Sequence, residues 1–256
     1  MQYGIPIFEL ILAGTALFAL SAQKAAAQEE ARDELRQTFQ LAASSRVEVL
    51  SVNDQVTIET SDSDVAEVEI VRLATRQRDL KYHPVNVEYT AGSLVIRGKE
   101  DRAAYGRGIH VRQQVKLRIP RRVSLLVKGI GGPVQVGELE GPVKVERVSG
   151  PVTIGPMTGA LTVAGTAGDL RVSVRRMDQS GIEISHVGGR VELRFAEAVN
   201  AELMAKSIGG DVQIDLPKVD RDGSDGAVSM SAHIGGGGAP ISIRQVSGTV
   251  RLSLGL

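Results

Sequence analysis

The sequence predicts an all-β fold, a single-stranded β-solenoid (β-helix) built from units of roughly nine residues. Two observations carry this prediction. From Arg46 onward, apolar residues alternate with polar ones in short runs separated by turn-forming residues, which is the pattern of β-strands. From Gly132 onward, the pattern G-x-h-x-h-x-x-h-x, in which h is an apolar residue, recurs every nine residues.

The nine-residue unit has a physical interpretation. Its third and fifth positions point to the same side of a strand and would face the interior. One unit cannot bury its apolar side alone, so we expect stacked coils of two or more units each. We expect each glycine to stand at a corner that needs a positive φ. A β-sandwich is the alternative fold. The units begin at Gly132, Gly141, Gly150, Gly159 and Gly168, and the pattern resumes at Gly181, Gly189, Gly210 and Gly248.

The chain divides into three parts. Residues 1–27 are expected to be a signal peptide cleaved after Ala27, because an apolar run ends in an A-x-A site. The alternative is an uncleaved membrane anchor. Residues 28–45 are expected to form a leader or a short helix. Residues 46–256 are expected to form the solenoid domain, with less regular strands over 46–128 and the repeat region over 129–256. Both alternatives for the first segment place the domain in the periplasm, the cell envelope or the extracellular space.

The composition excludes several classes of function. The chain has 256 residues and no cysteine, which excludes disulfides and thiolate metal sites. Its 30 basic and 30 acidic residues balance, and aromatic residues make up only 3%, so the composition argues against nucleic acid as a partner. The four histidines are not spaced as metal ligands. We therefore expect no cofactor.

One segment of the chain favours binding. No acidic residue occurs between residues 102 and 137. If the apolar residues within 109–119 face inward, His110, Arg112, Lys116 and Arg118 form a basic stripe on the outer side of a strand. Such a stripe could hold an acidic polysaccharide, lipid headgroups or an envelope protein. The simpler interpretation is that charges on an edge strand oppose aggregation.

Two further groups of acidic residues are weaker candidates. Asp220, Asp222 and Asp225 could offer oxygen ligands to calcium, but the twelfth position from Asp220 is a serine, which favours a solvated turn. Glu183 and Glu192 occupy equivalent outward positions of their units and would stack as an acidic pair. Such a pair would be needed if the chain were a carbohydrate-active enzyme.

Five strand motifs follow one another in a characteristic order, over residues 47–58, 65–70, 115–120, 148–154 and 212–217. This order resembles the DUF4097 family of adhesin-like bacterial β-solenoid proteins over about residues 46–254. One departure is Asp54, where the family often has glycine. The resemblance implies a solenoid in the cell envelope or outside the cell, and it supplies no catalytic residues.

The function predicted from these observations is a non-catalytic exported module that binds or scaffolds as an adhesin does. One alternative is a sensory or regulatory envelope protein that keeps its N-terminal anchor. A second alternative is a carbohydrate-active β-helix enzyme. The open ends of the predicted solenoid could also stack on a second copy of the chain.

Overall fold

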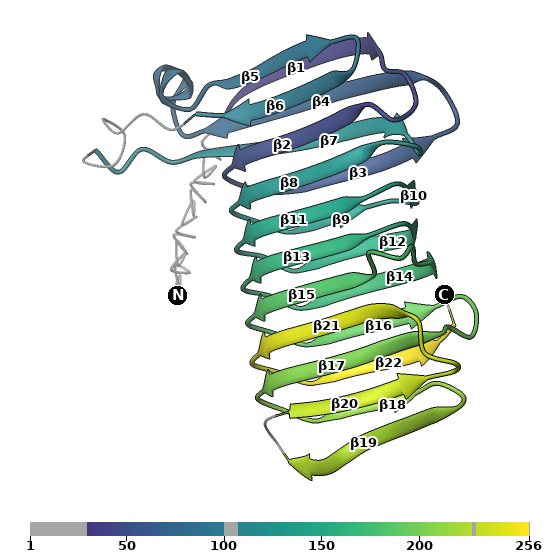
Figure 1. The fold of residues 1–256 in the computed structure, drawn as a ribbon. Helices are drawn as coiled ribbons and strands as arrows, with labels where there is room; N and C mark the ends of the chain where they lie inside the picture. The colour runs from purple at the N-terminus through teal and green to yellow at the C-terminus, as the bar shows by residue number, and fades with distance from the viewer. Residues whose placement is uncertain (1–29, 100–106, 227–228, 256) are drawn as a thin grey trace, which may run out of the picture.

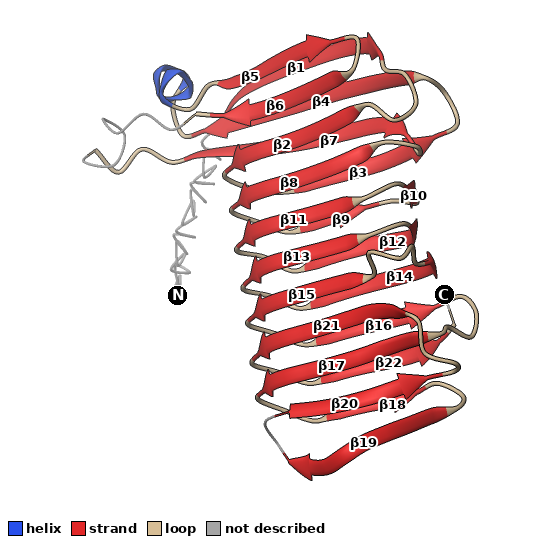
Figure 2. Ribbon diagram, viewed as in Figure 1, coloured by secondary structure: helices blue, strands red, loops and turns tan. Residues whose placement is uncertain are grey.

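The computed structural model of this chain describes residues 30–99, 107–226 and 229–255, without the side chains of 222–226. It confirms the all-β prediction. Two long sheets lie face to face and form an elongated stack (Figure 1). A single short 3₁₀ helix, η1 (Gln77–Tyr82), lies at one end, as Figure 2 shows, among the residues that the structure describes.

The first sheet, sheet A, has eleven strands. In spatial order they are β1 (Ala31–Gln40), β4 (Val65–Ala74), β7 (Val111–Pro120), β3 (Val56–Ser61), β9 (Val134–Val136), β12 (Val152–Thr158), β14 (Leu170–Arg176), β16 (Val191–Phe195), β22 (Val250–Leu254) and β18 (Val212–Asp215), with β10 (Leu139–Glu140) pairing with β12.

The second sheet, sheet B, also has eleven strands. In spatial order they are β19 (Val219–Gly226), β20 (Ser229–Ile234), β17 (Ala201–Ile208), β21 (Ala239–Val246), β15 (Ile182–Val187), β13 (Leu161–Thr166), β11 (Val143–Val148), β8 (Ser124–Ile130), β2 (Arg46–Val52), β6 (Ser93–Gly98) and β5 (Val85–Thr90).

The nine-residue unit is half of a turn. Successive units alternate between the two sheets, so that Val143 pairs with Leu161 in sheet B and Val152 pairs with Leu170 in sheet A. Both partners are therefore eighteen residues apart. The predicted inward positions are buried between the sheets, and Val145, for example, has no exposed surface. One continuous apolar core runs along the stack.

The finer prediction of a single-stranded solenoid is not confirmed, because both sheets are mixed. The central pairs are parallel, but β1, β4 and β7 pair antiparallel at one end, as do β17, β20 and β19 at the other. The chain also departs from sequential stacking. The turn β2–β3 lies between β6–β7 and β8–β9, and the turn β21–β22 lies between β15–β16 and β17–β18.

The repeat glycines serve two different purposes. In one column, Gly132, Gly150 and Gly168 lie above one another without a positive φ. A Cβ on Gly150 would lie 2.5 Å from the backbone carbon of Gly132, so this column needs glycine for close approach. Gly159 and Gly181 have φ values of 128° and 71°. The predicted positive φ is thus confirmed for these two glycines and wrong for the first column.

The N-terminal part differs from the sequence expectation. Residues 31–40, expected in a leader or short helix, form β1, because the strand can pair along its whole length with β4. Leu35 and Phe39 pack against the core from this strand. The predicted signal peptide, residues 1–27, lies outside the described residues. Among the described residues, no helix has the length and apolar character needed to cross a membrane.

Candidate anion-binding site

The predicted basic stripe lies on the outer face of sheet A. Strand β7 alternates as expected, with Val115, Leu117 and other apolar side chains buried in the core. The side chains that form the stripe are exposed. They are Arg112, Lys116 and Arg118 on β7, and His110 directly before it.

Acidic side chains on the neighbouring strands balance much of this stripe. Lys116 Nζ lies 2.8 Å from Glu59 Oε1 on β3, and this hydrogen bond raises the pKa of Lys116 above its usual value. Arg112 Nη2 lies 2.6 Å from Glu30 Oε2. Arg118 is in register with Glu59 on β3 and with a glutamate on β4. The stripe is therefore part of a face on which positive and negative charges alternate.

A more strongly cationic feature lies at the end of the stack that carries η1. It is a cleft of about 580 Å³ between the segment that follows β4, η1 itself and the segment that leads into β7. We call it the cationic cleft. Its lining residues are Thr75, Arg76, Arg78, Asp79, Lys81, Tyr82, Arg107, Gly108, Ile109 and His110.

Local sequence explains why η1 presents its charges to this cleft. Within η1 the apolar Leu80 is buried and packs with Ala74 and Val111 in a small separate cluster. The flanking residues Arg78 and Lys81 are exposed. Burial of one leucine thus anchors the turn and leaves its basic side chains outside.

A partly buried polar network anchors η1 to sheet A. Arg72 on β4 donates hydrogen bonds to the backbone oxygens of Leu80, at 3.0 Å, and His83, at 3.3 Å. Its Nε donates to Asp33 on β1 at 2.9 Å. Gln113, which is 1% exposed, donates to the same His83 oxygen at 3.0 Å. These bonds tie the carbonyls of Leu80 and His83 to side chains of sheet A, so η1 is anchored to that sheet.

Tyr82 organises two of the cations in the cleft. Lys81 Nζ lies 5.0 Å from the centroid of the Tyr82 ring, and Arg107 Cζ lies 5.9 Å from it. Arg107 Nη1 also donates a hydrogen bond to Tyr82 Oη at 3.0 Å. The two distances to the ring centroid, 5.0 Å and 5.9 Å, are within the range of a cation–π interaction. The ring thus determines where two positive charges stand.

Few acids oppose the charges of the cleft among the residues that the structure describes. The ion pair found among its lining residues joins Arg78 to Asp79 at a long distance of 3.9 Å.

Sequence reasoning identified His110 but missed Arg76 and Lys81, because a cleft between distant segments leaves no local pattern. The run of basic residues after β4, together with one tyrosine, is the signal that could have indicated it.

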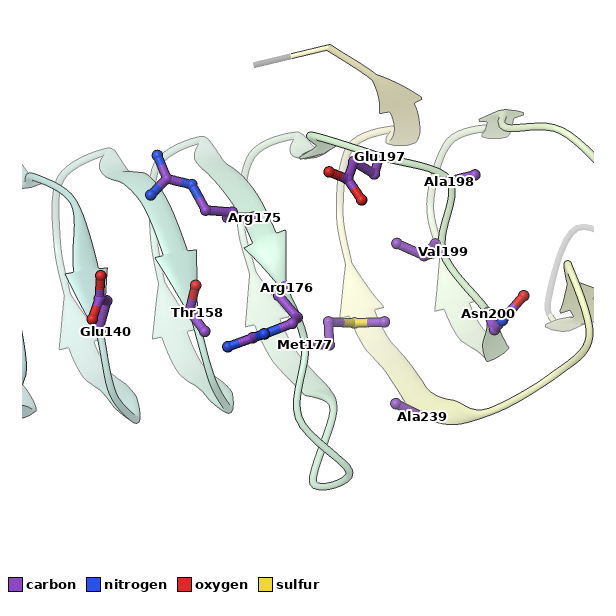
Figure 3. Close-up of a pocket in the computed structure, with 10 residues that line it drawn as sticks. All are labelled: Glu140, Thr158, Arg175, Arg176, Met177, Glu197, Ala198, Val199, Asn200 and Ala239. Carbon is purple, nitrogen blue, oxygen red and sulfur yellow. The ribbon is translucent and has the colours of Figure 1, made fainter.

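A second pocket, of about 540 Å³, lies where longer loops replace the regular corners after β14 and β16 (Figure 3). Its lining carries both signs of charge, including Arg176 and Glu197, and the partly buried apolar residues Met177 and Val199. Since neither sign dominates, this pocket does not indicate the charge of a ligand.

The structure separates the two glutamates that would have formed an acidic pair. Glu183 lies on β15 in sheet B and Glu192 on β16 in sheet A, so the expected stacking was wrong. The reason is that consecutive units occupy opposite sheets. Each is paired instead with arginine: Glu183 with Arg244, and Glu192 with Arg194 at 2.8 Å.

The predicted calcium ligands can be placed only in part. Asp220 is exposed on β19, next to His233 on β20 in the pairing register. The side chains of Asp222 and Asp225 lie outside the described residues. The calcium prediction therefore remains a prediction.

Comparison with known proteins gives a family model and several solved structures. The model described as Toastrack DUF4097 matches residues 53–253. A "putative cell adhesion protein" from Clostridium sporogenes is 9% identical, covering 88% of this chain and 100% of its own, with a TM-score of 0.40. A "putative adhesin" from Bacteroides fragilis is 10% identical, covering 86% and 97%, with a TM-score of 0.38. A "putative lipid binding protein" from Parabacteroides distasonis is 11% identical, covering 87% and 95%, with a TM-score of 0.28. No curated protein matched. Because the family model spans most of its length, the chain belongs to the Toastrack DUF4097 family.

Proposed function

We propose that this protein is a non-catalytic, exported module of the bacterial envelope or surface, which binds an anionic partner in the manner of an adhesin. The candidate partners are an acidic polysaccharide, lipid headgroups and an acidic envelope protein. Export follows from the expected signal peptide over residues 1–27. The rigid two-sheet stack serves as a scaffold that holds the binding site at one end.

The observation that carries the proposal is the contrast between two basic surfaces. On the stripe, Arg112 and Lys116 already contact glutamates within 3 Å. In the cationic cleft, the structure shows no carboxylate within 4 Å of Arg76, Lys81 or Arg107 among the residues it describes. A cation without a carboxylate partner keeps its full attraction for an incoming anion. We therefore place the binding site in the cleft.

A binding experiment tests this assignment. The full chain is titrated with polygalacturonate, with uncharged dextran as the negative control, at low and at physiological salt. The cleft variant Arg76→Gln/Lys81→Gln/Arg107→Gln should bind about tenfold more weakly, which corresponds to about 1.4 kcal/mol. Binding should also weaken as salt screens the charges.

The stripe offers a matched control that removes the same amount of charge. The variant Arg112→Gln/Lys116→Gln/Arg118→Gln should change the affinity less than twofold, because two of its three cations are already paired. If this variant loses more affinity for polygalacturonate than the cleft variant does, the binding site lies on the stripe and the assignment to the cleft is wrong. If the folded protein does not bind the polyanion, the proposed function itself is refuted.

The export part of the proposal has its own test. Intact mass and cell fractionation of the full chain expressed in a Gram-negative host would identify the mature N-terminus. A soluble periplasmic species that starts at Gln28 is expected. A full-length species in the membrane fraction would contradict cleavage and would support the anchored sensory protein.

A further inference from the structure

We propose that the cationic cleft binds a phosphate monoester group, free in solution or on a lipid. This inference rests on the proposed function, since it names the ligand class of the same site. It goes further because it predicts selectivity among anions. The phosphate group carries close to two negative charges at neutral pH and presents three acceptor oxygens.

The composition of the cleft matches such a group. Among the lining residues that the structure describes, Arg76, Arg78, Lys81 and Arg107 supply four positive charges and Asp79 supplies one negative charge, in a void of about 580 Å³. Three of these cations are arginines, whose planar guanidinium binds phosphate through two parallel hydrogen bonds. A phosphate dianion neutralises more of this excess of three positive charges than a monovalent carboxylate or sulfate ester does. The charge balance therefore favours a dianion.

The placement of the charges provides the second argument. Lys81 and Arg107 are long side chains, and fixing each of them on binding costs conformational entropy. The Tyr82 ring already restrains both, and Tyr82 Oη accepts a hydrogen bond from Arg107 Nη1 at 3.0 Å. Gln113 and Arg72 hold the turn beneath them. The site is thus organised before the ligand arrives, which strengthens binding without any additional contact.

The distinctive prediction concerns Tyr82, because its replacement removes no charge. Tyr82→Leu keeps every cation of the cleft but removes the ring that positions two of them. We expect about tenfold weaker binding of glucose 6-phosphate to this variant, measured by calorimetry at pH 7.5. Tyr82→Phe keeps the ring and loses only the acceptor for Arg107, so its affinity should fall about threefold.

Anion selectivity and the source of the phosphate are tested with matched ligands. The full chain is titrated with glucose 6-phosphate, glucose 6-sulfate and glucuronate. It is also titrated with vesicles of phosphatidylcholine, with and without phosphatidic acid. The phosphate monoester should bind at least about fivefold more tightly than the sulfate and the carboxylate. Vesicle binding that requires phosphatidic acid would identify a lipid source, and binding of glucose 6-phosphate alone would identify a soluble one.

The results separate this inference from the proposed function. Equal affinities for the three glucose derivatives, together with binding of polygalacturonate through the cleft, would overturn the phosphate inference and leave the binding module intact. An unchanged affinity of Tyr82→Leu would show that charge alone, without positioning by the ring, accounts for binding, and would also overturn it. Arg112→Gln, an exposed cation of the stripe, is the control and should leave phosphate binding unchanged.

Discussion

Replacement of Gly150 by alanine tests the close approach of backbones in the glycine column. The added Cβ would lie 2.5 Å from the backbone carbon of Gly132, 2.6 Å from its oxygen and 2.6 Å from the nitrogen of Pro133. Ordinary contacts begin near 3.4 Å. All three neighbours are backbone atoms held by the pairing of β9 with β12, so they cannot rotate away as a side chain would.

The expected magnitude follows from two opposing effects. Alanine restricts the unfolded chain, which alone would stabilise the protein by about 0.5 kcal/mol. Overpacking in a region that cannot relax costs about 1–3 kcal/mol. We therefore expect Gly150→Ala to lower the free energy of unfolding by about 1.5 kcal/mol, or the melting temperature by about 3–6 °C for a chain of this size.

Thermal unfolding followed by circular dichroism measures this change. Gly92→Ala is the control, because no atom lies within 4 Å of a Cβ at Gly92 and its φ is not positive. That variant should be neutral or slightly stabilised. A melting temperature of Gly150→Ala equal to that of Gly92→Ala would refute the explanation by close approach.

Two more predictions concern polar groups. Gln113→Leu removes the side-chain acceptor of the Asn53 backbone N–H and one of the two donors to the His83 carbonyl, so we expect a loss of about 1–2 kcal/mol in urea unfolding, whereas Gln114→Leu, at a half-buried outward position, should cost less. Hydrogen bonds from Lys128 and then Lys144 lower the pKa of Glu146 from 4.5 to about 2. This lowered pKa contributes stability above about pH 4.5 that is lost as the pH falls toward 2. Lys128→Met should raise the pKa of Glu146 in an NMR titration and flatten the acid dependence of stability, and an unchanged pKa would contradict the assignment.

The central turns were predictable because their constraint is local and repeated. Alternation identified the inward residues, such as Val134 and Val152, and the period of nine identified the units. The number of units per turn was not determined by the sequence pattern, since either one sheet or two could satisfy the same alternation. That ambiguity led to the incorrect stacking of Glu183 on Glu192.

The ends of the molecule were less predictable, because long-range pairing determines them. Residues 31–40 have a thin apolar stripe, and their strand conformation depends on β4, which lies more than twenty residues further along the chain. The residues of the basic stripe are exposed on the outer face of sheet A, and their role in binding remains a prediction. Its neutralisation by Glu59 was not visible in the sequence, because β3 and β7 are joined by a long stretch of chain. The cationic cleft was missed for the same reason.

The insertion of β21–β22 between earlier turns affects the order in which the protein can be completed. Strand β17 pairs with β21 and β20, and β18 pairs with β22. A ribosome makes residues 239–254 after residues 201–226. Until they are made, β17 lacks its native partner β21 and β18 lacks its native partner β22. Stacking each turn in the order of synthesis therefore cannot produce the native order of turns, because the last turn made lies between two earlier ones.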